Sequence, residues 1–189
     1  DVPSADGFHD RCYDRISVPD HQEPGWSDQC RYSRLGRLRT VHPGRSADPS
    51  VLVTMDTYAI QGLLPDQIQF LYAPSHLNPT YEYGVTFERG TAVTYGDRKQ
   101  IFISGTASID NRGEIVAPGN IINQAKRMME NVEVLLAEAG ATWKDVMQAI
   151  VYLRDPADYQ VVSDFLAEEY PGLPCLLVHA PVCRPGWLC

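Results

Sequence analysis

The chain has 189 residues, of which 44% are hydrophobic and 21% charged, and its 16 basic and 24 acidic side chains give a formal net charge of −8. A chain of this length and composition accommodates one globular domain with its own core, either alone or with a substantial extension. The negative charge argues against a nucleic-acid-binding protein that works by neutralising phosphates, because such proteins carry a surplus of Lys and Arg.

The cysteines and the hydropathy give two further expectations. Five cysteines lack both the even count of a disulfide framework and the C-x-x-C spacing of a zinc site: Cys12, Cys30, Cys175, Cys183 and Cys189. We therefore expect reduced thiols and a cytoplasmic protein. No run of about 18 apolar residues is present, so we expect no membrane-spanning helix.

The N-terminal part of the chain shows little periodicity. The segment before Ser50 is rich in Asp, Arg, Ser, Pro and Gly, and two short apolar runs of strand length follow, Ser50–Met55 and Gln67–Ala73. The step Pro65-Asp66 marks a turn between them. We predict an irregular N-terminal extension or incomplete second domain over residues 1–75, and a separate domain over residues 76–189.

A period of two, typical of strands, begins after Tyr81. The alternating positions predict a half-buried strand with Gly90 as a bend or bulge: Val85, Phe87, Thr91, Val93 and Tyr95. Gly96-Asp97 is a turn signal, and a second strand is expected at Gln100–Ser104. Together these strands predict a hairpin.

The next segment has the period of a helix. Apolar residues share one face of it: Ile121, Ala125, Met128, Val132, Leu135 and Ala139. Pro118 stands near the start and Gly140 just past the end, as is typical of helix boundaries.

A strand, a second helix and a further strand follow. The strand is expected at Val146–Leu153, and Asp155 is expected to cap a helix that has Pro156 at its first position. The inner face of this helix is predicted to contain Tyr159, Val162, Phe165 or Leu166, and Tyr170. Further strands are expected at Leu176–Val178 and, only just begun, at Gly186–Cys189.

The predicted order over the second part of the chain is therefore β-β-α-β-α-β. Two helices on one face of a mixed sheet define an α+β fold. The other face of such a sheet needs cover, and oligomerisation would provide it.

Several short motifs occur in this order. Ile103-Ser104-Gly105-Thr106 ends the second strand, and Val151-Tyr152-Leu153-Arg154-Asp155 leads into Asp158-Tyr159. The first helix carries a spaced set of residues, Gln124, Asn131, Leu135 and Gly140. Together these motifs resemble those of the YjgF/YER057c/UK114 (RidA-like) superfamily.

The resemblance implies a chorismate-mutase-like fold and a homotrimer with clefts for small carboxylated metabolites between subunits. It also implies hydrolysis of enamine or imine intermediates to a 2-oxo acid and ammonia, without a metal or an organic cofactor. That chemistry requires a cation for the substrate carboxylate and a held water molecule.

The chain departs from the superfamily pattern at several positions. The arginine of the family's P-x-R word is replaced by Leu176 in Pro174-Cys175-Leu176. Phe87 stands where the family has a tyrosine, and Ser163 where it has a helix asparagine. The family's acid on the last strand would lie beyond Cys189. A non-catalytic trimer that binds a small ligand is therefore the alternative to an enzyme.

Other words resemble the chorismatases, which remove pyruvate from chorismate and carry an extra N-terminal region. These words are Phe87-Glu88-Arg89-Gly90, Ser104–Ile109 and Val182-Cys183-Arg184. In that interpretation, Arg89 and Arg184 would bind the two carboxylates of the substrate.

The candidate site residues follow from these motifs. The substrate-binding candidates are Phe87, Arg89, Ser104, Gly105, Thr106, Ser163 and Arg184. The candidates for catalysis are Glu88, as an acid, and Cys183, whose thiol would be activated by the neighbouring cation. A surface arginine at a turn, a small buried thiol and a solvated glutamate are the simpler interpretations of Arg184, Cys183 and Glu88.

Overall fold

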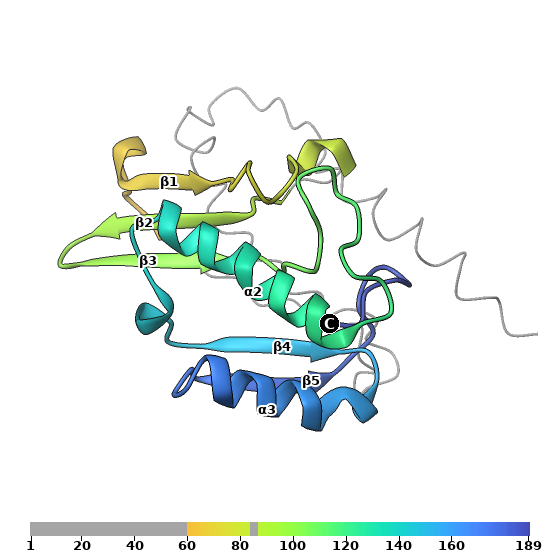
Figure 1. Cartoon of the computed structure of the whole chain (residues 1–189). Coiled ribbons are helices and arrows are strands. Elements are labelled where there is room, and N and C mark those ends of the chain that lie inside the picture. Colours follow the sequence, from red (N-terminus) through yellow and green to blue (C-terminus); the bar gives the residue numbers. More distant parts are fainter. Residues whose placement is uncertain (1–59, 84–86) are drawn as a thin grey trace, which may run out of the picture. The chain divides into compact units, whose positions relative to one another are not determined.

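A computed structural model describes residues 60–83 and 87–189 (Figure 1). The strand predicted at Ser50–Met55 and the first alternating position, Val85, lie outside the described residues. The strand predicted at Gln67–Ala73 is present as β1 (Ile68–Leu71). The proposed domain boundary after residue 75 stays a prediction, and β1 lies on its N-terminal side.

Three antiparallel strands form the first sheet, in the order β1, β2 (Gly90–Tyr95) and β3 (Arg98–Ile103). The predicted hairpin is confirmed by the pairing of Gly90 with Ile103 and Tyr95 with Arg98. The strand starts later than predicted, however, and Gly90 is its buried first residue, paired with Leu71 as well as with Ile103. A β-carbon at this position would lie 3.0 Å from Leu71 Cδ1, so glycine makes room for β1.

Helix α2 (Ile121–Glu138) confirms the first predicted helix. The Asn120 side chain caps it by accepting a hydrogen bond from the Asn123 N–H at 3.0 Å, and Gly140 follows its end with φ +71°. The buried face contains two polar side chains in addition to the apolar ones: Gln124, Ala125, Met128, Met129, Asn131, Leu135 and Leu136.

Strands β4 (Ala149–Leu153) and β5 (Cys175–His179) run parallel and are connected by α3 (Tyr159–Glu169). β4 begins three residues later than predicted, and a 3₁₀ turn formed by Trp143–Asp145 precedes it. In that turn, the Asp145 carboxylate accepts hydrogen bonds from the Thr142 N–H and hydroxyl at 2.8 and 3.0 Å.

The cap predicted at Asp155 is present, but on a different element. Its carboxylate accepts a hydrogen bond from Ala157 N–H at 2.9 Å and caps a 3₁₀ turn (Pro156–Asp158) that precedes α3. Because α3 starts only after this turn, Tyr159 is 51% exposed, and its predicted place on the inner face is wrong. Val162, Phe165 and Leu166 are buried as predicted, and Tyr170, just past the end of α3, is partly buried against the same cluster.

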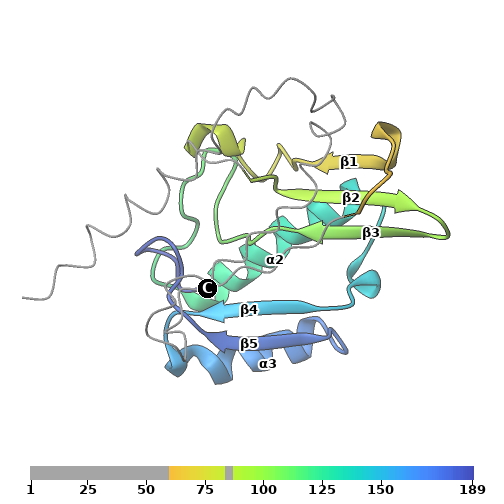
Figure 2. The same ribbon diagram turned by 180° about the vertical axis from the view of Figure 1, so that it is seen from behind.

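The two helices cover one face of the strands, as predicted (Figures 1 and 2). Two apolar clusters make up the core, and α2 contributes to both. Met128 packs with β4 and α3 in the first cluster, whereas Leu135 packs with residues of β1 and β2 such as Leu71 in the second. Among the described residues, the antiparallel and parallel strands form separate ladders, so α2 is the element that bridges them.

The strand predicted to begin at Gly186–Cys189 is not formed by these residues. Gly186 lies in a turn, and the backbone of Leu188 bonds to other elements instead of to a ladder. Its N–H donates to Gln124 Oε1 at 2.9 Å, and its carbonyl accepts from Arg154 N–H at 2.9 Å. In the part of the chain that the structure describes, no helix has the length and apolar character required to cross a membrane.

The close approach at Gly90 gives a stability prediction. We expect Gly90→Ala to lower the free energy of unfolding by about 1–3 kcal/mol, since its methyl carbon would lie 3.0 Å from Leu71 Cδ1 and 3.2 Å from the Phe102 carbonyl oxygen. Chemical denaturation followed by circular dichroism measures the change. Gly105→Ala is the matched control, because a β-carbon at Gly105 meets nothing within 4 Å. Equal midpoints for the two variants would contradict the packing argument.

Candidate functional site

Most of the candidate residues lie on loops at one side of the domain. β2 begins and β3, β4 and β5 end on this side, at the right of Figure 1. Two connecting segments lie there too, the 104–120 loop between β3 and α2, and the 180–188 segment after β5. The topology thus brings together chain segments that are about 80 residues apart in sequence.

Arg89 is buried, with 5% of its surface exposed. Its Nε–H and Nη2–H donate to the Asn78 carbonyl at 3.2 and 2.9 Å, and Nη2–H also donates to Asn78 Oδ1 at 3.1 Å. The guanidinium lies 5.3 Å from the centroid of the Phe87 ring. These contacts hold the segment before β2 against the segment that contains Asn78.

Four more candidates lie next to Arg89, where β3 ends beside the start of β2. They are Glu88, Ser104, Gly105 and Thr106. Ser104 N–H donates to the Arg89 carbonyl at 3.0 Å, and the Ser104 hydroxyl donates to the Glu88 carbonyl at 2.5 Å. The Thr106 hydroxyl donates to the Ser104 carbonyl at 3.0 Å, and Gly105 between them is exposed. The two hydroxyl oxygens retain lone pairs that can accept further hydrogen bonds.

Arg184 lies in a turn that contacts the middle of the 104–120 loop, at Gly113. Its guanidinium donates to the Gly113 carbonyl at 3.3 Å and lies 5.1 Å from the centroid of the Trp187 ring. Arg184 is half-buried, whereas the neighbouring Cys183 is exposed. The interpretation of Cys183 as a small buried thiol is therefore wrong.

Asp110 shapes the part of the loop that contacts Arg184. Its carboxylate accepts hydrogen bonds from the N–H groups of Arg112 at 2.8 Å and Glu114 at 3.0 Å. These two bonds, with smaller contributions from the charges of Arg112 and Arg127, hold the pKa of Asp110 below its ordinary value. The turn so formed presents the Gly113 carbonyl, with Gly113 at φ +76°.

Ser163 does not join either group of candidates. It is half-buried on α3, beside Val162, which packs into the cluster formed with α2 and β4. Leu176, expected at the position of the family arginine, lies on β5 and is 63% exposed.

Arg154 and Gln124 hold the 182–188 segment. Both occur in the sequence motifs, but neither was predicted as a site residue. The Arg154 side chain and the buried Gln124 side chain both bond to its backbone. Arg154 belongs to the sequence motif that links β4 to α3, and Gln124 interrupts the apolar face of α2. A polar residue on the apolar face of a predicted helix is the signal that could have indicated Gln124.

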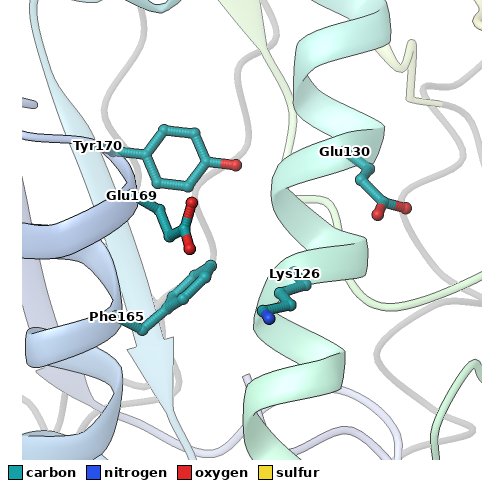
Figure 3. Close-up of a pocket in the computed structure, with 5 residues that line it drawn as sticks. All are labelled: Lys126, Glu130, Phe165, Glu169 and Tyr170. Carbon is teal, nitrogen blue, oxygen red and sulfur yellow. The ribbon is translucent and has the colours of Figure 1, made fainter.

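A shallow cavity of about 220 Å³ lies elsewhere, between α2 and α3 (Figure 3). It is lined by Lys126, Glu130, Phe165, Glu169 and Tyr170. Figure 3 shows the last three pointing toward α2. Burial, followed by the nearby glutamates, raises the pKa of Tyr170. None of the candidate residues lines this cavity, and no cluster of His, Cys, Asp or Glu suited to a metal occurs among residues 60–83 and 87–189.

Antiparallel and parallel strands under two helices, with polar loops gathered at one end, define an α+β domain of the RidA-like type. The family model described as Endoribonuclease L-PSP matches residues 90–185, just over half of the chain. The protein therefore belongs to this family, and the resemblance to the YjgF/YER057c/UK114 superfamily is confirmed.

Individual proteins are similar over shorter stretches. A RutC family protein of Pyrococcus abyssi is 42% identical over 77 residues, 38% of this chain and 60% of that protein. The 3-aminoacrylate deaminase RutC of Acinetobacter baylyi is 32% identical over 82 residues, 41% of this chain and 65% of that protein. The chain thus spans less than two thirds of the length of these relatives.

The fold has a counterpart among solved structures. A YjgF/YER057c/UK114 family member from Mycobacterium tuberculosis has a TM-score of 0.50 and 20% identity, over 64% of this chain and 92% of that chain. At this level of identity the likeness supports the fold alone.

The turn at Asp110 gives a pH-dependent prediction. Because its pKa is lowered in the folded protein, the ionised carboxylate stabilises the fold above the ordinary value of 3.8, and this contribution is lost as the pH falls through the folded-state pKa. We therefore expect Asp110→Asn to lower the denaturation midpoint at pH 7, by a difference that shrinks as the pH approaches the folded-state pKa. Asp97→Asn, which removes an exposed ion pair with Arg98, is the control and should change the midpoint less. A pH-independent difference for Asp110→Asn would contradict this account.

The described cysteines should differ in reactivity. Cys183 is exposed, whereas burial raises the pKa of Cys189 to about 11. Because the thiolate is the reactive form, we expect iodoacetamide at pH 8 to modify Cys183 well before Cys189, as measured by peptide mass spectrometry. Denatured protein, in which both thiols react at similar rates, is the control. Equal rates in the native protein would show that Cys189 is not buried.

Proposed function

We propose that this protein is a RidA-like enzyme that acts on a small carboxylated metabolite between the subunits of a homotrimer, by enamine or imine hydrolysis. The observation that supports it most directly is the half-buried Arg184 guanidinium, stacked on Trp187 and held at the Gly113 carbonyl. A stacked guanidinium keeps its plane fixed and can present N–H groups to a carboxylate.

The proposed reaction replaces an amino group by a carbonyl group. A proton adds to the enamine carbon to give an iminium, water attacks the iminium carbon, and the resulting carbinolamine releases ammonia and leaves a carbonyl product. Glu88 is our candidate for the proton transfers. The hydroxyls of Ser104 and Thr106 and the backbone at Gly105 are candidates for holding the water, because they lie at the same corner.

The remaining candidates have supporting roles in this proposal. The Phe87 ring, already stacked against Arg89, would pack against the substrate. Ser163 would come to the site from a neighbouring subunit, since it lies apart from the other candidates within one chain. Cys183 is an exposed thiol beside Arg184, and because water is the nucleophile in this hydrolysis we propose no covalent step at it. We further propose a cytoplasmic location, on the basis of the cysteine pattern.

An apolar face supports the proposed assembly. On the side of β4 and β5 opposite the helices, Ile150 pairs with Leu176 and Tyr152 with Val178. Ile150 and Val178 are each 38% exposed, and Leu176 is 63% exposed. A contiguous apolar patch on one sheet face favours burial against another subunit.

The name of the Acinetobacter relative, a 3-aminoacrylate deaminase, makes 3-aminoacrylate the first substrate to test. Pyruvate removal from chorismate is the second reaction. It is less favoured, because Arg89 donates three hydrogen bonds to the buried Asn78 instead of lying open to a second carboxylate. We do not extend the family's endoribonuclease label to this chain, whose net charge is −8.

A non-catalytic trimer that binds a small carboxylated ligand is the second candidate function. The observation in its favour is Leu176, an exposed apolar residue at the position of the family's carboxylate-binding arginine. Such a protein would bind a small acid without converting it.

Turnover of 3-aminoacrylate by the wild-type protein, and its loss in Arg184→Ala, would distinguish the enzyme from the non-catalytic binding protein. We expect ammonia release from 3-aminoacrylate to fall about 10- to 100-fold in kcat/KM, the effect of losing a charged hydrogen bond, with Arg184→Lys intermediate. Arg98→Ala, at the exposed hairpin turn, is the control and should keep full activity. Binding of the acid without turnover in the wild-type protein would support the second function instead. Unchanged activity of Arg184→Ala would overturn the assignment of Arg184.

A further inference from the structure

Arg154 bonds to the backbone of the 182–188 segment at four points. Its Nε–H donates to the Trp187 carbonyl at 2.6 Å, and its Nη2–H donates to the carbonyls of Val182, at 3.0 Å, and Arg184. Its own backbone N–H donates to the Leu188 carbonyl at 2.9 Å. One side chain thus fixes three carbonyls that lie within six residues of the same turn.

The bonded carbonyls include the one that belongs to Arg184 itself. Fixing the carbonyls of Arg184 and Trp187 fixes the peptide planes from which both side chains project. The 5.1 Å stacking of the Arg184 guanidinium on the Trp187 ring depends on this relative placement. A further backbone bond, from Trp187 N–H to the Arg184 carbonyl at 3.1 Å, closes the turn.

Gln124 holds the other end of the segment from helix α2. Its Nε2–H donates to the Gly186 carbonyl at 3.0 Å, and its Oε1 accepts from Leu188 N–H at 2.9 Å. Its contacts do not include the Arg184 carbonyl. The orientation of Arg184 therefore depends more on Arg154 than on Gln124.

The Arg154 guanidinium is bonded to carbonyl dipoles, and within the described residues no carboxylate forms an ion pair with it. Its positive charge therefore adds to that of Arg184 at the same turn. Two cations that meet at one turn, Arg184 within it and Arg154 bonded to its backbone, favour an anionic ligand over a neutral one.

We infer that Arg154 is a positioning residue: it orients the Arg184 guanidinium over Trp187 and reinforces the positive potential that attracts a carboxylate. This inference rests on the proposed role of Arg184 in substrate binding and extends it to a residue that need not touch the substrate. A lysine cannot replace Arg154, because an ammonium at the end of a flexible stem lacks the planar set of donors that spans three carbonyls.

Fluorine NMR of the full chain labelled with 5-fluorotryptophan tests the orientation directly. The Trp187 resonance is assigned with Trp187→Phe, and its response to loss of the stacked guanidinium is calibrated with Arg184→Ala. We expect Arg154→Lys to move or broaden the Trp187 resonance as Arg184→Ala does, while the Trp143 resonance is unchanged. Arg98→Lys is the matched control and should move neither. An unchanged Trp187 resonance in Arg154→Lys, or equal changes at Trp143, overturns the inference.

Kinetics test the link to substrate binding. We expect Arg154→Lys to raise KM for 3-aminoacrylate about tenfold with a smaller change in kcat, since misplacement of a binding group mainly weakens substrate binding. We also expect the double variant Arg154→Lys/Arg184→Ala to be no worse than Arg184→Ala alone, because both changes remove one interaction. Additive losses would contradict a positioning role.

The two experiments fail in distinguishable ways. A wild-type protein that neither binds nor converts 3-aminoacrylate refutes the proposed function for that substrate, while the Trp187 resonance still decides whether Arg154 orients Arg184. If Arg154→Lys does not fold, hydrogen exchange of the Arg154 Nε–H in the wild-type protein replaces the comparison of variants. The Arg154 Nε–H should then exchange slowly with solvent, because it donates to the Trp187 carbonyl, and fast exchange overturns the inference.

Discussion

The two buried amide side chains of helix α2 are the interactions on which the arrangement of the loops depends. Asn131 Nδ2–H donates to the carbonyls of Ala107 and Ile109, both at 3.0 Å, and so fixes the start of the 104–120 loop. Gln124, about two helical turns earlier, fixes the end of that loop at Ala117 as well as the 182–188 segment. Both side chains are fully buried. Losing Gln124 would remove the partner of the Gly186 carbonyl and of the Leu188 N–H, whereas the Ala107 and Ile109 carbonyls also accept hydrogen bonds from the Ile109 N–H and from Arg127 Nε–H.

The same helix also holds the two sheets together. The described strands β3 and β4 belong to different ladders, and the apolar residues of α2 pack on both sides of the gap. A helix that joins two sheets and fixes two loops couples the core to the candidate site. Substitutions on the buried face of α2 should therefore change the site geometry together with stability, whereas changes at the β2–β3 hairpin turn should not.

The order of helices and strands could be predicted because each depends on a local period, as in the apolar face of α2. The start of α3 was misplaced because a short 3₁₀ turn, capped by Asp155, takes up residues that the period alone assigns to the helix. β4 starts at Ala149, so the three residues before it, which the apolar run assigned to the strand, connect it to the preceding 3₁₀ turn. Motifs also brought out most of the residues of the candidate site. The partners of Arg89 and Arg154 could not be predicted, since their hydrogen bonds reach 11 to 33 residues away and no local pattern records them.

The hydrogen bonds of Gln124 have a consequence for the order of folding. They join positions up to 64 residues apart, whereas the hairpin and α2 form from contacts between near neighbours. Closing so long a chain segment costs entropy that only an already packed helix and strand can offset. We expect the turn around Arg184 to be among the last parts of the domain to become ordered. It should also open in local fluctuations more readily than the packed core, so its amide protons should exchange with solvent sooner than those of α2.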